Sequence, residues 1–109
     1  RPSLLSKARK ADLLICTGAE LEIGWLPLLQ RKTGNSKIQD GADGYFMASD
    51  EVSMLGIPTV LDRSQGDVHA MGNPHIQTDP NNIIDVASAL NERLQTIDPA
   101  HSDEYQQRY

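Results

Sequence analysis

The stretch GDVHAMGNPHIQTDP, residues 66–80, places two histidines around a turn-forming run. Imidazole is the commonest protein ligand for zinc, and it also suits manganese, copper and iron. The run Gly-Asn-Pro directly precedes His75 and would fix the backbone there, because proline restricts φ and asparagine can bond its own backbone two residues on. A rigidly held imidazole loses less ordering entropy when it binds an ion. This pattern predicts His75 as a metal ligand, with an ordinary polar loop as the alternative reading.

Three other side chains of this stretch could support such a site. His69 lies six residues before His75, so the chain between them must fold back before both rings can touch one ion. We expect His69 to be either an accessory contact or a solvated loop histidine. Asn73 and Asp79 are candidates for supporting contacts, and a carboxylate at Asp79 would also offset the positive end of the following helix. Since a metal site takes three or four ligands, the others must come from different parts of the protein.

Length and composition limit the classes of protein to which this chain can belong. Its 109 residues suit one small domain or part of a larger one. A net charge of −5 argues against a nucleic-acid partner, which would require a basic face. No apolar run approaches the roughly 18 residues of a membrane span. Cys16 is the sole cysteine, so no internal disulfide and no cysteine-based zinc site can form, and its apolar neighbours predict a small buried hydrophobe.

The first third of the chain reads as a helix, a strand and a second helical segment. Ser3 can cap the opening helix, and the apolar run Leu13–Cys16 is typical of a short buried parallel strand. Residues 19–32 follow a helical pattern, but Pro27 must either kink this helix or end it and start another near Trp25. The side chains expected to face inward from this pattern are Leu21, Trp25, Leu28 and Leu29.

The last third of the chain has the clearest helical signals. Asp79 supplies a capping side chain, and Pro80 follows it at the first helical position. Apolar residues then recur every three or four positions, which predicts an amphipathic helix over Pro80–Ile97. An Asp-Pro pair recurs at positions 98 and 99 and predicts a final, polar helix.

The middle of the chain gives weaker signals, with strand-like segments at Tyr45–Met47, at Thr59–Leu61 and around Ile76. The order of helix, strand, helix, mixed middle and helix is that of an α/β fold. We therefore expect a single domain over residues 1–109 with an open, mostly parallel sheet flanked by helices. Ligands of such sheets bind at the carboxyl ends of the strands, and the histidine loop is expected at that edge.

Two motifs resemble those of a known family. GNPHIQTDPNNI is similar to the motif Asn/Asp-Pro-His, short strand and Asp-Pro before a long helix, which marks the metal-binding receptors of bacterial ABC-type zinc and manganese importers. ADLLICTGAELEIGWLPLL resembles a second stretch of that family, in which an apolar strand precedes Gly-x-x-Leu-Glu-x-x-Trp-Leu. The resemblance covers most of the chain except roughly Lys37 to Val60, and it is closest to the zinc-type receptors.

The resemblance implies two α/β lobes joined by a long rigid helix, with the metal held in the cleft between them. The usual site has three histidines and one Asp or Glu, and the histidine of the Asn-Pro-His motif carries over to His75. By the same resemblance, the first ligand histidine would lie upstream of Arg1 and the remaining ligands in a second lobe. We therefore expect the chain to be most of an N-terminal lobe. Only His69 stands where zinc receptors often carry a histidine-rich loop.

The implied function is that of a periplasmic or extracytoplasmic solute-binding protein. It would capture a divalent metal, zinc or alternatively manganese, and pass it to the membrane permease of an ABC importer. Such a receptor is not an enzyme, because a saturated metal cage leaves no position for a reactive water. Its affinity should fall as pH drops and the ligands protonate.

Two other functions stay open at the level of the residues. A zinc- or manganese-dependent hydrolase could use His69, His75 and either Asp67 or Asp79, but it would need an open coordination position and a general base. A nucleotide-binding module would need its phosphate loop in CTGAELEIG, which lacks the required glycine spacing and the lysine.

Overall fold

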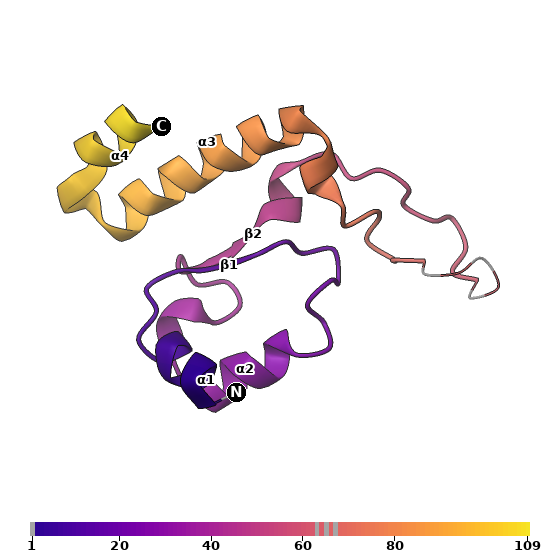
Figure 1. The fold of residues 1–109 in the computed structure, drawn as a ribbon, viewed down its shortest axis with the longest axis horizontal. Helices are drawn as coiled ribbons and strands as arrows, with labels where there is room; N and C mark the ends of the chain where they lie inside the picture. Colours follow the sequence, from indigo (N-terminus) through magenta and orange to yellow (C-terminus); the bar gives the residue numbers. More distant parts are fainter. Residues whose placement is uncertain (1, 63, 65, 67) are drawn as a thin grey trace.

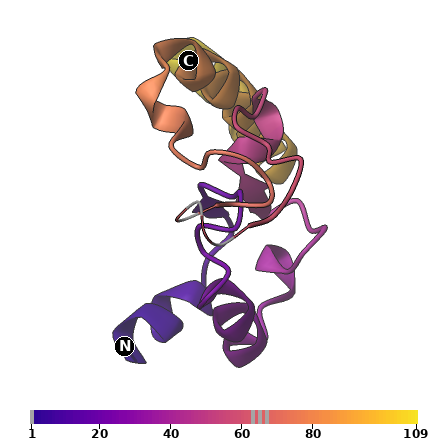
Figure 2. The ribbon, with the colours of Figure 1, turned by 90° about the vertical axis from the view of Figure 1, so that its right-hand side faces the viewer.

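The computed structural model describes residues 2–62, 64, 66 and 68–109. In this part of the chain, four α-helices surround a two-stranded parallel sheet, which confirms the expected α/β class. Figures 1 and 2 show α1 and α2 on one side of the strands and α3 and α4 on the other. The helices are α1 Pro2–Ala8, α2 Leu26–Thr33, α3 Pro80–Ile97 and α4 Ser102–Arg108, and the strands are β1 Leu14–Cys16 and β2 Tyr45–Met47.

The two strands run parallel in a register that pairs Ile15 with Phe46. Each is a short apolar or aromatic run of the kind that fits a half-buried pleated surface. Because the strands are parallel, both end at the same edge of the sheet. A hydrogen bond of 2.8 Å from the Ser49 backbone N–H to the Thr17 carbonyl ties the two chain segments together there. This carboxyl edge is where the fold can bring distant loops together.

The core lies between the sheet and α3. Phe46 is 1% exposed and packs with Ala48 and Ile76. The partly buried apolar side chains of α3 that pack against this cluster are Val86, Ala89 and Leu90. The predicted helix Pro80–Ile97 is confirmed with the same bounds, and the Asp79 carboxylate caps it by accepting the Asn81 backbone N–H at 2.9 Å. The amphipathic pattern of α3 therefore builds one wall of the core, as expected from its periodicity.

The helix expected over residues 19–32 is wrong in its first half. Residues 19–25 form successive turns, and α2 begins at Leu26, with Pro27 in its first turn. Proline is tolerated there because the first helical N–H groups have no partner within the helix. Leu26 is 5% exposed and is the buried side chain of α2. The side chains predicted to face inward but found exposed are Leu21, Trp25 and Leu28.

Two of the expected strand segments differ from the structure. Residues 59–61 form no strand, and no described segment pairs with them, so Val60 and Leu61 stay exposed. Ile76 lies in a 3-10 turn, Ile76–Thr78, rather than in a strand. The turn forms because Thr78 and Asp79 bond back to carbonyls three residues earlier.

The helix starts differ slightly from those expected at both ends of the chain. The first helix begins at Pro2, so Ser3 lies inside its first turn rather than at the cap. The final helix does start at the Asp-Pro pair, but with a 3-10 turn, Pro99–His101, before α4. Neither difference affects the histidine loop, which lies between β2 and α3 (Figure 1).

Candidate metal site

The backbone before His75 is shaped by close packing against an earlier part of the loop. Gly72 adopts φ +99°, a left-handed conformation that side chains rarely take. A Cβ at this position would lie 2.9 Å from the Leu55 carbonyl oxygen. The next backbone N–H, of Asn73, donates to that same carbonyl at 2.7 Å, and Pro74 is fully buried. The backbone before His75 is therefore fixed by its contact with Leu55 as well as by its own sequence.

The Asn73 side chain sets the orientation of the His75 ring. Its Oδ1 accepts the His75 backbone N–H at 3.0 Å and lies 2.9 Å from the ring Nδ1. Because a backbone N–H can only donate, the facing atom of the amide must be the oxygen. An oxygen acceptor requires the proton of the neutral ring on Nδ1, which leaves the lone pair on Nε2. His75 is exposed, and an oriented ring with a lone pair on Nε2 is what a metal ligand requires.

The chain is also anchored directly after His75. The Thr78 hydroxyl donates to the His75 carbonyl at 2.8 Å, and the Thr78 backbone N–H donates to it at 3.2 Å. Asn82 of α3 donates to the next carbonyl, that of Ile76, at 3.0 Å. We did not predict these contacts, although a threonine three residues after His75 is a recognisable local signal. His75 is thus held on both sides of its Cα.

The two loop histidines line one hollow of about 830 Å³. The Gly72 backbone N–H donates to the His69 carbonyl at 3.1 Å, so the chain between the histidines does fold back. His69 is partly buried and His75 is exposed. Other residues lining this hollow include Ile57, Pro58, Val60 and Val68.

No other metal-binding side chains of the described residues join these two. Within residues 2–62, 64, 66 and 68–109, no three His, Cys, Asp or Glu side chains come together as a metal cluster. Asp67, a candidate for the hydrolase reading, lies outside the described residues. Asp79 caps α3, and the His75 Nδ1 contacts Asn73 instead. A supporting role for Asp79 at the metal therefore stays a prediction.

The histidine loop contacts the carboxyl edge of the sheet. The Ala70 backbone N–H donates to the Glu20 carboxylate at 3.3 Å, and Glu20 belongs to the turn that follows β1. This is the edge at which parallel sheets bind ligands. The contact joins residues 50 positions apart, and no local sequence signal announces it.

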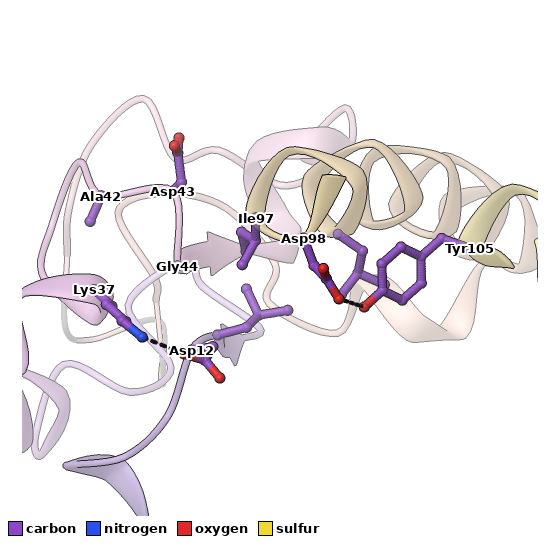
Figure 3. Close-up of a pocket in the computed structure, with 10 residues that line it drawn as sticks. Asp12, Lys37, Ala42, Asp43, Gly44, Ile97, Asp98 and Tyr105 are labelled. Atoms are coloured by element: carbon purple, nitrogen blue, oxygen red, sulfur yellow. Dashed lines mark hydrogen bonds and ion pairs between the residues drawn. The ribbon is translucent and has the colours of Figure 1, made fainter. Parts of the chain in front are cut away.

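A second hollow, of about 550 Å³, lies at the opposite edge of the sheet (Figure 3). An ion pair of 2.6 Å joins Lys37 to Asp12 at its wall, and the Tyr105 hydroxyl donates to Asp98 at 2.9 Å. None of the described residues that line it is a histidine or cysteine. Its exposed ion pair contributes little stability and offers no ligand set for a transition metal.

The sole cysteine of the sequence, Cys16, is not placed to bind a metal. Its side chain is buried at the end of β1. Burial, with a smaller contribution from the Glu22 carboxylate, raises the pKa of the Cys16 thiol to about 11. The thiolate is the form that binds metals, so a thiol that stays protonated does not compete for zinc. The prediction of a small buried hydrophobe is confirmed.

Comparison with known proteins identifies the family of this chain. Over residues 1–109 the chain matches the ZnuA family, described as zinc-uptake complex component A, periplasmic. No curated protein and no solved structure matches the chain. None of the helices among the described residues is long and apolar enough to cross a membrane. Since the family match spans every residue, the chain belongs to the ZnuA family of periplasmic zinc-uptake components.

Proposed function

We propose that this chain captures zinc through the Nε2 of His75 and delivers it to an ABC importer. One observation carries the proposal: the Asn73 amide oxygen, 2.9 Å from Nδ1, leaves the opposite nitrogen of an exposed ring free to bind. His69, on the same hollow, is proposed as an accessory contact. The remaining ligands are proposed to come from outside the described residues.

Zinc is proposed as the cargo, with manganese as the alternative. A nitrogen ligand suits either ion, but the match to zinc-uptake components favours zinc. We propose binding without turnover, since complete coordination by protein ligands leaves no position for an activated water. Because only neutral imidazole can bind, metal affinity should fall as pH is lowered.

We also propose that the chain packs as one lobe within a larger two-lobed receptor. Its accessible surface is 7705 Å², whereas a self-contained 12.0 kDa domain would expose about 6,000 Å². Its radius of gyration is 15.7 Å, against about 13 Å for a compact domain of this length. Apolar side chains are exposed beside the histidine loop, and they include Leu55, Ile57, Val60, Leu61 and Met71.

Zinc titration of the full-length protein against a chelator of known affinity tests the proposal. We expect one tight site, which His75→Ala weakens by about 100-fold or more, because an ordered ligand is lost. His101→Ala is the matched control and should leave zinc affinity unchanged, since that ring lies in the α3–α4 corner. Tight binding that survives His75→Ala would overturn the ligand assignment.

Two further measurements separate a carrier from a hydrolase and zinc from manganese. Ester and phosphate substrates should show no turnover at saturating zinc. Metal uptake into vesicles that contain the importer should depend on the added receptor and should be lost with His75→Ala. Tighter binding of manganese than of zinc at the same site would move the proposal to the alternative cargo.

A further inference from the structure

The turn that follows β1 has a strained backbone. Three consecutive residues have positive φ: Gly18 at +89°, Ala19 at +49° and Glu20 at +66°. Glycine adopts such angles freely, but alanine and glutamate rarely do. Non-glycine residues persist in this conformation only when their surroundings hold them there, and such positions cluster at functional sites.

Side chains other than Glu20 hold this turn. The two oxygens of the Glu22 carboxylate accept the backbone N–H groups of Thr17 at 2.8 Å and Gly18 at 3.0 Å. From the neighbouring strand end, the Ser49 hydroxyl accepts the Ala19 N–H at 3.1 Å. The backbone of Glu20 is therefore fixed without help from its own side chain, which is left for another role.

The Glu20 side chain is directed to the histidine loop. Its Oε2 accepts the backbone N–H of Ala70, the residue after His69. Glu20 also lines a small hollow with Val68 and Ala70, and Val68 in turn lines the hollow that holds both loop histidines. The strained turn thus contacts the part of the loop that presents His69.

We propose that Glu20 is a positioning residue for the metal site. Its carboxylate joins the His69 side of the loop to the fixed turn after β1, so that less loop entropy is lost when zinc is captured. It acts through the Ala70 amide and does not bind the ion. This inference rests on the proposed function of the loop in zinc binding.

Zinc titration of full-length Glu20 variants tests this role. We expect Glu20→Ala to weaken binding by about 3- to 10-fold, the range for loss of one exposed hydrogen bond. Glu20→Gln should restore most of the affinity, because an amide oxygen can still accept from Ala70. Glu92→Ala, an exposed carboxylate change on α3, is the matched control and should bind like the unmodified protein.

A second measurement follows the contact without metal. Hydrogen exchange at the Ala70 amide should accelerate in Glu20→Ala and stay slow in Glu20→Gln. Equal losses of zinc affinity in both variants would mean that the charge acts on the ion itself and would overturn the positioning role. Unchanged exchange at Ala70, or unchanged zinc affinity in Glu20→Ala, would overturn it as well. Failure of the proposed function shows differently, as zinc binding in the unmodified protein that does not depend on His75.

Discussion

Two histidines of this chain follow a proline closely, and their rings have different partners. The first corner is residues 72–75, and the second corner is residues 98–101. At the first corner, the His75 Nδ1 lies 2.9 Å from the neutral Asn73 amide oxygen. At the second, the His101 Nδ1 lies 2.9 Å and 3.0 Å from the two oxygens of the Asp98 carboxylate. Both rings are oriented through the same nitrogen, but only the second partner carries a charge.

The charge of the partner decides what each ring can do. At the second corner, the hydrogen bond that His101 donates to the Asp98 carboxylate raises the pKa of His101, and the same bond lowers the pKa of Asp98. In its protonated form the His101 ring has no lone pair for a metal, and the positive charge of that form is favourable near the C-terminal end of α3. At the first corner, the amide orients the ring without adding a charge. The comparison shows that a charged partner favours the cationic form of a histidine ring, whereas a neutral amide orients a ring without favouring that form.

Disturbing the backbone conformation of the first corner should have the largest effect on stability and on zinc affinity. We expect Gly72→Ala to destabilise the fold by about 2 kcal/mol or more and to weaken zinc binding by about 100-fold, because φ is positive and the Leu55 carbonyl blocks the added Cβ. Gly34→Ala is the control: its φ is also positive, at +58°, but nothing lies within 4 Å. It should cost about 1 kcal/mol and leave zinc affinity unchanged. Urea unfolding and zinc titration measure both, and equal effects would mean that the packing at Gly72 is unimportant.

Removing the ring partner of the first corner should have a smaller effect. Asn73→Ala leaves the His75 ring free to rotate and should weaken zinc binding by about 10-fold, as is common when a residue supporting a ligand is lost. The melting temperature should change little, since both polar groups are exposed and can bond to water. Affinity equal to that of the unmodified protein would show that the amide does not orient the ring.

Replacing the amide beside His75 by a carboxylate, as at the second corner, should shift the pH dependence of zinc release. In Asn73→Asp, a carboxylate beside Nδ1 would favour the protonated ring, so protons would compete with zinc up to a higher pH. The pH at which half of the zinc is released should therefore rise relative to the unmodified protein. Zinc release followed from pH 8 to pH 4 measures this, and an unchanged or lower midpoint would contradict the role given to partner charge.

The smallest effect is expected at the second corner. Because the pKa of Asp98 is lowered, its contribution to the stability of the α3–α4 corner is present above pH 3.8 and is lost as pH falls through the lowered value. Because the pKa of His101 is raised, its contribution is present below pH 6.5 and is lost as pH rises through the raised value. Docking of α4 should therefore be strongest between these two pH values. Amide exchange in α4 would report it, and Asp98→Asn should abolish the pH dependence without affecting zinc.

Elements set by neighbouring residues could be predicted from the sequence. The bounds of α3 follow from Asp79 and Pro80 together with a regular apolar period, all of which act within a few residues. The corner at His75 was also predictable, because glycine, asparagine and proline act locally on the backbone. Its protonation pattern needed the structure, since it depends on which Asn73 atom faces the ring.

Elements set by distant residues could not be predicted. Residues 19–25 carry a helical pattern, yet the chain enters this segment through a left-handed turn. Glu22 accepts the Thr17 and Gly18 backbone N–H groups, and Ser49 accepts that of Ala19. Ser49 lies 30 positions from the amide that it accepts. Two other hydrogen bonds also join residues far apart in the sequence. The Leu55 carbonyl accepts the Asn73 backbone N–H, and the Glu20 carboxylate accepts that of Ala70. No local pattern predicts either bond. Local patterns therefore predicted His75 as a ligand, but they did not predict the distant contacts that hold its loop.

Helix α3 connects the two corners and sets the distance between them. Its 18 uninterrupted residues span about 27 Å at the usual helical rise. Its far end therefore lies well away from the capped end that follows His75 and can serve as a reference point for distance measurements. A pair of spin labels, one at Thr96 near the end of α3 and one at Thr59 on the rim of the histidine hollow, would report any motion of that rim during zinc loading as a change of distance.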